Sequence, residues 1–101
     1  MIAAFSKGLM QRKYLAKIFV TLRNSVLDPA GVAVQSGLTQ MGYDNVEQVR
    51  IGKYIELIIV APDEMKARRD LNKICYEMLS NPVIENYRFD LIEVESQTGA
   101  F

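Results

Sequence analysis

The chain has 101 residues, half of them apolar, which is enough for one globular domain and too few for two ordinary domains. Twelve Lys and Arg residues balance twelve Asp and Glu residues, so charge gives no reason to expect capture of nucleic acid or of an anionic membrane. The absence of histidine and the single cysteine exclude a disulfide within the chain, a thiolate metal cluster and a histidine-based catalytic pair.

Residues 13–23 alternate between apolar and polar side chains, which is the period of a half-buried β-strand. One face of this predicted strand carries Ala16, Ile18, Val20 and Leu22, and the other carries Lys17, Phe19, Thr21 and Arg23. We expect the first face to pack against the core.

A helix is predicted from Asp28 to about Met41. Asp28 offers an N-cap oxygen, Pro29 suits the first helical position, and Gly42 suits the residue that ends a helix. At helical spacing the predicted buried stripe consists of Ala30, Val34, Gly37, Leu38 and Met41. Small residues in this stripe would allow a close approach to the sheet or to another chain.

Two further strands are predicted at 46–51 and 54–61, joined by a tight turn at Gly52-Lys53. The second of them is a nearly continuous apolar run, which indicates a central position in a sheet.

A second helix is predicted to begin after Pro62-Asp63 and to end at Asn81-Pro82. Its apolar stripe is expected to contain Met65, Leu71, Ile74, Cys75, Met78 and Leu79. Cys75 is therefore interpreted as a small core residue and not as a reactive thiol. Residues 87–95 alternate again and form the fourth predicted strand.

The element order β-α-β-β-α-β predicts an α+β, ferredoxin-like split β-α-β sandwich, with a four-stranded antiparallel sheet and two helices on one face. The helix-free face would have an apolar centre with charges at its rim, which is typical of a protein interface. We expect self-association through Phe19, Thr21, Tyr54, Ile58 and Val60. The alternative is a partly exposed sheet with scattered apolar residues, which is normal on monomers.

The sequence has no phosphate-binding loop, dinucleotide fingerprint or nucleophile elbow, so no catalytic, cofactor or metal residue is predicted. RNA-recognition motifs share this element order, and Ile18–Leu22 is similar to their first strand. The predicted third strand argues against RNA binding, because Tyr54 is followed by Glu56, whose carboxylate would repel phosphate. No apolar run approaches the ~20 residues of a membrane span, so we expect a cytoplasmic protein.

Three segments are explained by no core pattern: 25–31 (SVLDPAG), 49–54 (VRIGKY) and 81–87 (NPVIENY). Together with 19–22 (FVTL), they resemble the signature segments of the PurS family, the small subunit of phosphoribosylformylglycinamidine (FGAM) synthase. The resemblance runs from about residue 14 to 95, so the domain is placed at 13–95. Residues 96–101 would be a frayed tail. Residues 1–12 would be an N-terminal extension, expected to be disordered, which leaves open an interaction arm, an upstream start or an expression remnant.

The resemblance implies a non-catalytic subunit of a ligase in de novo purine biosynthesis. A glutaminase subunit of that enzyme releases ammonia from glutamine, and a large synthetase subunit uses ATP to place it on formylglycinamide ribonucleotide (FGAR), which gives FGAM. The small subunit would bridge these two partners, assist ammonia transfer and form a homodimer or homotetramer. It would bind no cofactor alone, while the complex uses ATP and magnesium. The alternative is a stand-alone dimeric ligand-binding module of the same fold, such as an ACT-like sensor.

The family segments place partner-docking candidates at three sites: Asp28 and Pro29 with Gly31, then Arg50, Gly52, Lys53 and Tyr54, and finally Asn81 and Pro82 with Tyr87. Capping is the preferred explanation of the first site, a helix stop of the third, and turn geometry of Gly52. Two cations at one exposed turn have no evident structural duty, so Arg50 and Lys53 are the preferred docking residues. Changing both to Glu is expected to leave folding intact and to weaken assembly.

Overall fold

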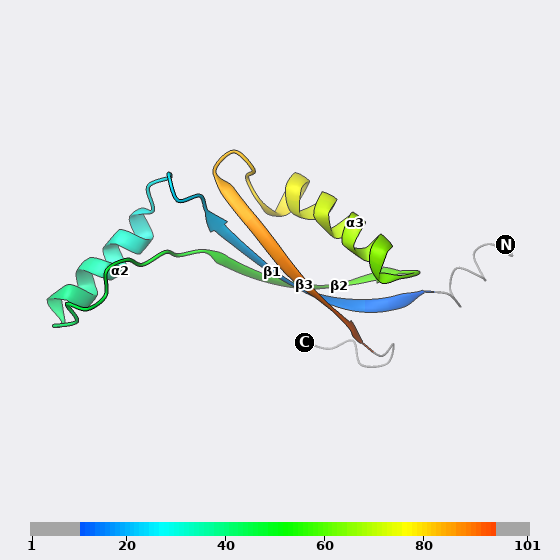
Figure 1. Cartoon of the computed structure of the whole chain (residues 1–101), viewed down its shortest axis with the longest axis horizontal. Helices are drawn as coiled ribbons and strands as arrows, with labels where there is room; N and C mark the ends of the chain where they lie inside the picture. The colour runs from blue at the N-terminus through cyan, green and yellow to red at the C-terminus, as the bar shows by residue number, and fades with distance from the viewer. Residues whose placement is uncertain (1–10, 95–101) are drawn as a thin grey trace, which may run out of the picture.

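The computed structural model describes residues 11–94, and its strands form one antiparallel sheet in the order β2-β1-β3 (Figure 1). The elements in chain order are β1 (Arg12–Leu22), α2 (Pro29–Gln40), β2 (Lys53–Ala61), α3 (Glu64–Ile74), the π-helical turn η1 (Cys75–Leu79) and β3 (Glu85–Val94). The α+β class, the antiparallel pairing and the two predicted helices are confirmed. The predictions of an N-terminal extension and of a frayed tail concern residues 1–10 and 95–101, which lie outside the described residues. The extension was predicted to reach residue 12, but Arg12 already begins β1.

The central strand β1 buries one face, as its alternation predicts. Ile18 lies opposite Ile55 of β2 and Phe89 of β3, so apolar side chains meet across all three strands. Tyr14, Ala16, Ile18 and Val20 expose 3% of their surface or less. Because the side-chain period of a strand is two, Lys17, Phe19 and Thr21 point to the other face of the sheet.

Helix α3 covers the apolar face of the sheet. The side chain of Asp63 accepts a hydrogen bond from the backbone N–H of Lys66, which caps the helix start, 2.8 Å away. Ala67, Leu71 and Cys75 follow at four-residue spacing and are fully buried. Burial raises the pKa of the Cys75 thiol, because an apolar surrounding disfavours the thiolate, so the predicted core role is confirmed.

The predicted stripe of this helix is wrong at two positions. Met65 and Met78 expose 71% and 81% of their surface, whereas Ala67, which the prediction omitted, is buried. The buried line runs through Ala67, Leu71 and Cys75. Met65 lies two residues before this line, and Met78 lies in the π-helical turn η1, where the wider turn changes the phase of the side chains. The large apolar side chains of the two methionines made them candidates for burial, but their angular position around the helix places them on its exposed side.

The predicted strand at 46–51 is not formed, so the sheet in residues 11–94 has three strands instead of four. The backbone of this segment is held by the α2 side of the molecule. The Gln35 side-chain amide donates to the carbonyls of Val46 and Glu47, at 3.3 and 2.6 Å. The N–H of Ile51 donates to Asp28. With these partners the segment runs beside α2, and no tight turn forms at Gly52-Lys53.

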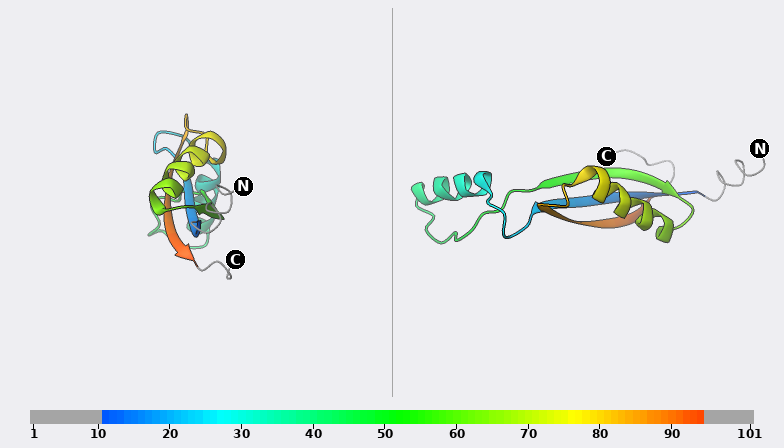
Figure 2. Two further views of the ribbon diagram at one scale, coloured as in Figure 1. Left: turned by 90° about the vertical axis from the view of Figure 1, so that its right-hand side faces the viewer. Right: turned by 90° about the horizontal axis from the view of Figure 1, so that it is seen from above.

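Helix α2 forms where it is predicted but does not lie on the sheet. It extends beyond the sheet end at which β1 finishes, as the separate views show (Figures 1 and 2). Of its predicted buried stripe, Ala30, Val34 and Met41 are exposed, with Val34 at 44% and Met41 at 73%, while Gly37 and Leu38 are partly buried; Gly31 is the one buried residue of the helix. The Cα radius of gyration is 18.8 Å, against about 13 Å for a compact domain of ~100 residues. The two-helix layer of a ferredoxin-like fold is therefore not formed within residues 11–94.

No helix among residues 11–94 combines the length and the apolar character that crossing a bilayer requires.

Candidate partner-docking site

Nearly all predicted docking residues gather at one end of the sheet. We call this region the junction: the end of β1 and the loop to α2 (residues 20–31), the segment before β2 (residues 49–53), and the loop to β3 (residues 80–85). Strand register brings these pieces together, because Val20 pairs with Lys53 and Leu22 pairs with Glu85. Seven predicted residues lie here: Asp28, Pro29, Arg50, Gly52, Lys53, Asn81 and Pro82.

Asp28 connects two segments of the junction through its carboxylate. One carboxylate oxygen accepts a hydrogen bond from the N–H of Gly31 at 3.0 Å, which confirms the predicted N-cap. The other accepts from the N–H of Ile51 at 2.9 Å. Hydrogen bonds from the N–H groups of Ile51 and Gly31, with the nearby charge of Arg50, lower the pKa of the Asp28 carboxyl below its ordinary value of 3.8. Asp28 therefore joins the start of α2 to the segment that leads into β2.

Arg50 has a structural duty, so the contrary expectation is wrong. Its guanidinium donates to the carbonyls of Leu22 and Arg23 at 3.0 and 2.8 Å, and a longer 3.5 Å contact reaches the carbonyl of Val26. Leu22 is the last residue of β1, and the Arg23 carbonyl also accepts from the N–H of Val26 at 2.9 Å, so Arg50 adds its donors where the chain turns away from the sheet. A planar group with several donors can serve these carbonyls together. A charge reversal at Arg50 would therefore disturb the fold as well as any docking.

Two glycines allow close backbone approach at the junction. A Cβ atom at Gly31 would collide with the carbonyl oxygen of Val49, and one at Gly52 would lie 2.5 Å from the carbonyl oxygen of Val20. Among residues 11–94 only Gly42 has a positive φ. Gly52 is therefore needed for the approach of the 49–53 segment to β1, and not for turn geometry as predicted.

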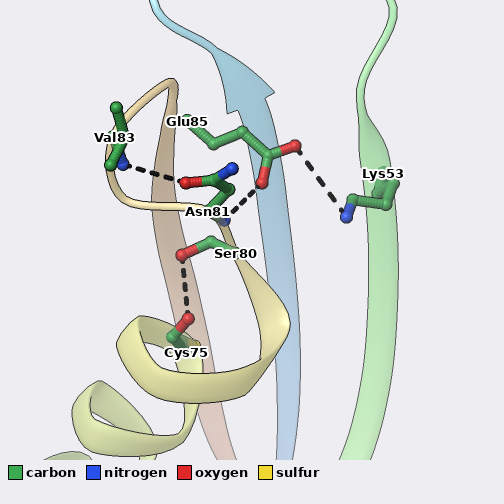
Figure 3. Close-up of polar contacts among 6 residues, drawn as sticks. All are labelled: Lys53, Cys75, Ser80, Asn81, Val83 and Glu85. Carbon is green, nitrogen blue, oxygen red and sulfur yellow. Dashed lines mark hydrogen bonds and ion pairs between the residues drawn. The ribbon is translucent and has the colours of Figure 1, made fainter.

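The loop between η1 and β3 is closed by Glu85, which sequence reasoning missed (Figure 3). Asn81 donates its backbone N–H to Glu85 Oε1 at 2.6 Å, and its side-chain oxygen accepts from the N–H of Val83 at 3.2 Å. Ser80 Oγ donates to the carbonyl of Cys75 at 2.8 Å. Asn81-Pro82 ends the helix as predicted. The sequence does contain a carboxylate four residues after Asn81, which could have indicated this loop closure.

Lys53 is a cation of the junction that stays largely open to solvent, while the exposed Arg23 donates to the carbonyl of Pro82 at 2.6 Å. Its Nζ lies 3.8 Å from Glu85 Oε2, and 57% of its side chain is exposed. An ion pair of this length and exposure contributes little to folding. Lys53 also lies at the rim of a mainly apolar hollow of about 500 Å³, which Val20, Leu22 and Ile51 line.

The helix-free side of the sheet, which we call the open face, carries the five predicted self-association residues: Phe19, Thr21, Tyr54, Ile58 and Val60. Strand register places all of them on the side opposite α3, and no helix of residues 11–94 covers it. Half of the surface of Tyr54 and of Val60 is exposed. The face is therefore present as predicted, and its use in association stays a prediction.

Aromatic and charged groups order the centre of the open face. The Tyr54 ring lies 5.1 Å from the Phe19 ring, and the Arg88 guanidinium lies 4.0 Å from the Phe19 centroid on the neighbouring strand. The Tyr54 hydroxyl donates to Glu56 at 2.6 Å, and this bond raises the tyrosine pKa to about 12. These contacts hold large side chains in place, which lowers the entropy cost of binding a partner.

In the part of the chain that the structure describes, no three Cys, Asp or Glu residues gather as a possible metal site. The carboxylates of Asp28 and Glu85 accept backbone N–H groups and shape the junction, and neither points at a second acid.

Comparisons with known proteins agree with one another. The PurS family profile, described as phosphoribosylformylglycinamidine (FGAM) synthase, matches residues 15–93. The chain is 59% identical to the Synechocystis phosphoribosylformylglycinamidine synthase subunit PurS over 86 residues, which are 85% of this chain and 86% of the relative. It is similar to the Bacillus subtilis PurS structure, with a TM-score of 0.71 and 44% identity over 79% of this chain and 99% of the other. It is also similar to a chain of the Thermotoga maritima PurLQS structure, with a TM-score of 0.73, 32% identity and coverages of 79% and 98%.

Asp28→Asn is expected to change the pH dependence of stability. Because the pKa of Asp28 is lower in the folded chain, the carboxylate stabilises the fold fully above about pH 4 and loses this effect as pH falls through its lowered folded pKa. The difference in unfolding free energy between wild type and Asp28→Asn should therefore be largest near neutrality and shrink in acid. Urea unfolding at several pH values measures it, with Asp44→Asn as a control, and parallel pH profiles for wild type and Asp28→Asn would contradict the role.

Arg50→Lys is expected to lower the free energy of unfolding by about 1–2 kcal/mol, because a single ammonium group cannot replace a guanidinium that donates hydrogen bonds to two carbonyls. Urea unfolding followed by circular dichroism measures the change. Arg69→Lys on the exposed side of α3 keeps the same chemistry and should leave stability nearly unchanged. Equal losses in both variants would show that the junction contacts of Arg50 are unimportant.

Proposed function

Because the chain belongs to the PurS family and is a subunit of phosphoribosylformylglycinamidine synthase in purine biosynthesis, we propose that it bridges the synthetase and glutaminase subunits of that enzyme. In this role it performs no reaction by itself and assists the transfer of ammonia to FGAR. The solved PurLQS structure of Thermotoga maritima supports the partners, since it joins a chain of this fold with PurL and PurQ. The complex would use ATP and magnesium without binding them on this subunit, and it would act in the cytoplasm.

The observation that carries this proposal is the junction. Its carboxylates and guanidinium are bound to backbone groups, so they set the shape of a surface instead of moving protons. A rigid surface suits a bridging subunit, because ammonia released to water becomes ammonium, which is not nucleophilic. A subunit that holds two active sites in register and excludes water supports ammonia transfer without a catalytic group.

In this proposal two surfaces of the chain bind different partners. At the junction, Lys53 with Asn81 and Pro82 contacts the synthetase or glutaminase subunit. Asp28, Pro29, Arg50 and Gly52 keep the shape of that surface. The open face, with Tyr54 among its residues, serves self-association into a dimer or tetramer.

Reconstitution of the synthase tests the bridging role. With this chain omitted, synthesis of FGAM from glutamine should be lost, while synthesis from added ammonium salts should persist, because only the transfer of ammonia depends on the bridge. Adding the chain back should restore the glutamine-dependent rate. Full glutamine-dependent synthesis without the chain would refute the bridge. Copurification with a small ligand and with neither partner would favour a stand-alone sensor instead.

Lys53→Ala is expected to weaken assembly without unfolding the chain. The substitution removes an exposed cation from the junction rim, and its weak contact with Glu85 contributes little to folding. We expect roughly fivefold weaker binding to the partner subunits, about 1 kcal/mol, measured by titration calorimetry with circular dichroism as a folding check. Lys73→Ala on exposed α3 is the matched control. Unchanged binding by folded Lys53→Ala would remove this residue from the docking surface.

A further inference from the structure

The hollow of about 500 Å³ at the junction lies on the side of the sheet that α3 covers, which we call the apolar side. Val20 is buried on this side, and its strand partner Lys53 shares the side because paired residues point the same way. Glu85 lies on the same side for the same reason, since its partner is Leu22. Small-molecule sites commonly occupy about 300–1,000 Å³. The hollow therefore has the size of a ligand site, and β2 and β3 each contribute one charged residue to it.

The wall of the hollow is mainly apolar. Its apolar lining consists of Val20, Leu22 and Ile51, with Pro29 and Ala30 at the start of α2. Ile51 exposes 43% of its surface, so its side chain is available to a ligand. Asp28 also lines the hollow, but both of its carboxylate oxygens already accept backbone N–H groups. An apolar group placed here is therefore removed from water without displacing a polar contact.

Lys53 and Glu85 place opposite charges beside this apolar wall, and they point toward each other (Figure 3). Lys53 Nζ lies 3.8 Å from Glu85 Oε2, which is longer than a hydrogen bond, so this contact does not use the ammonium hydrogens. Glu85 is held in place, because its Oε1 accepts the N–H of Asn81 and only 16% of its side chain is exposed. Its Oε2 has the capacity to accept further donors. A fixed carboxylate and an open ammonium group thus lie side by side in the hollow.

We propose that the hollow binds an α-amino acid with a large apolar side chain. The head group of an amino acid carries a carboxylate and an ammonium close together, so it can lie antiparallel to the pair formed by Lys53 and Glu85. Its carboxylate then meets Lys53, its ammonium meets Glu85, and the charges alternate in sign. Hydrogen bonds between charged groups are about twice as strong as those between neutral groups. The apolar side chain of the ligand packs against the wall formed by Val20, Leu22 and Ile51.

A ligand with a single charge fits this pair less well. A plain carboxylate that meets Lys53 brings its charge close to Glu85, and a plain amine that meets Glu85 brings its charge close to Lys53. The zwitterionic head group is the one that satisfies both residues and adds no net charge to the hollow. This proposal concerns the chain alone and does not rest on its role in the synthase.

Titration of the isotope-labelled full chain, followed by NMR, tests the site. L-leucine and L-phenylalanine should each give saturable shifts of the backbone signals of residues 20–22, 51–53 and 85, with dissociation constants of about 1 mM or tighter. Isocaproate and isoamylamine keep the apolar group of L-leucine but lack its ammonium and its carboxylate, respectively. Each should bind at least about tenfold more weakly than L-leucine. L-glutamine keeps the head group without an apolar side chain, and it should also bind more weakly.

Two substitutions each remove one charge from the hollow and preserve its shape. Glu85→Gln keeps an oxygen that can accept the N–H of Asn81, and Lys53→Met keeps a long unbranched side chain. Each variant should bind L-leucine at least about tenfold more weakly than wild type. Lys73→Met and Glu77→Gln make the same changes on the exposed sides of α3 and η1, and both should bind like wild type. Circular dichroism checks that all variants are folded.

Several results would overturn the proposal. Absence of saturable shifts with both apolar amino acids at about 10 mM would show that the hollow is not a site for them. Equal affinity for L-leucine, isocaproate and isoamylamine would show that the charged pair is not used, and equal affinity for L-glutamine would remove the apolar wall from the site. Unchanged L-leucine binding by folded Glu85→Gln and Lys53→Met would place the ligand elsewhere. The ligand series on the wild-type chain keeps the test decisive if a variant fails to fold.

Discussion

The carboxylate of Asp28 is the contact on which the arrangement of this chain depends. By accepting from Gly31 and from Ile51, it fixes the direction of α2 and draws the following segment away from the sheet. Arg50 completes the connection by satisfying the carbonyls that follow β1. Asp28 and Gln35 together hold residues 46–51 beside α2, where this segment lies outside the sheet.

This constraint leaves a small sheet with one covering helix, which is a marginal amount of core for a stable domain. The fully buried apolar side chains form two small clusters, one around Ile18 and Leu71 and one around Tyr14 and Ala67. Much of the remaining apolar surface is on α2, on the edge strands and on the open face. Association that buried this open apolar surface would add to the stability of the chain.

The junction and the open face are suited to a subunit that acts by binding other proteins. The junction is shaped by polar groups that are already bound to backbone, and the open face holds its aromatic side chains in fixed positions. The apolar side and the open face lie on opposite sides of one sheet. A partner bound on one side would therefore leave the residues of the other side free.

The sequence alone determined the local features: the alternation of β1, the cap at Asp28, the helix ends, β3 and the family to which the chain belongs. These follow from periods of two and 3.6 residues and from signature segments, which need no knowledge of distant contacts. It also named most of the residues that gather at the junction, although it saw no structural role for Arg50 and missed Glu85; the gathering itself follows from strand register. Only the tertiary structure decided that residues 46–51 lie outside the sheet, that α2 does not pack on the sheet and that Met65 and Met78 face solvent. Each of these depends on which distant group takes a hydrogen bond or an apolar contact, and local pattern carries no record of that choice.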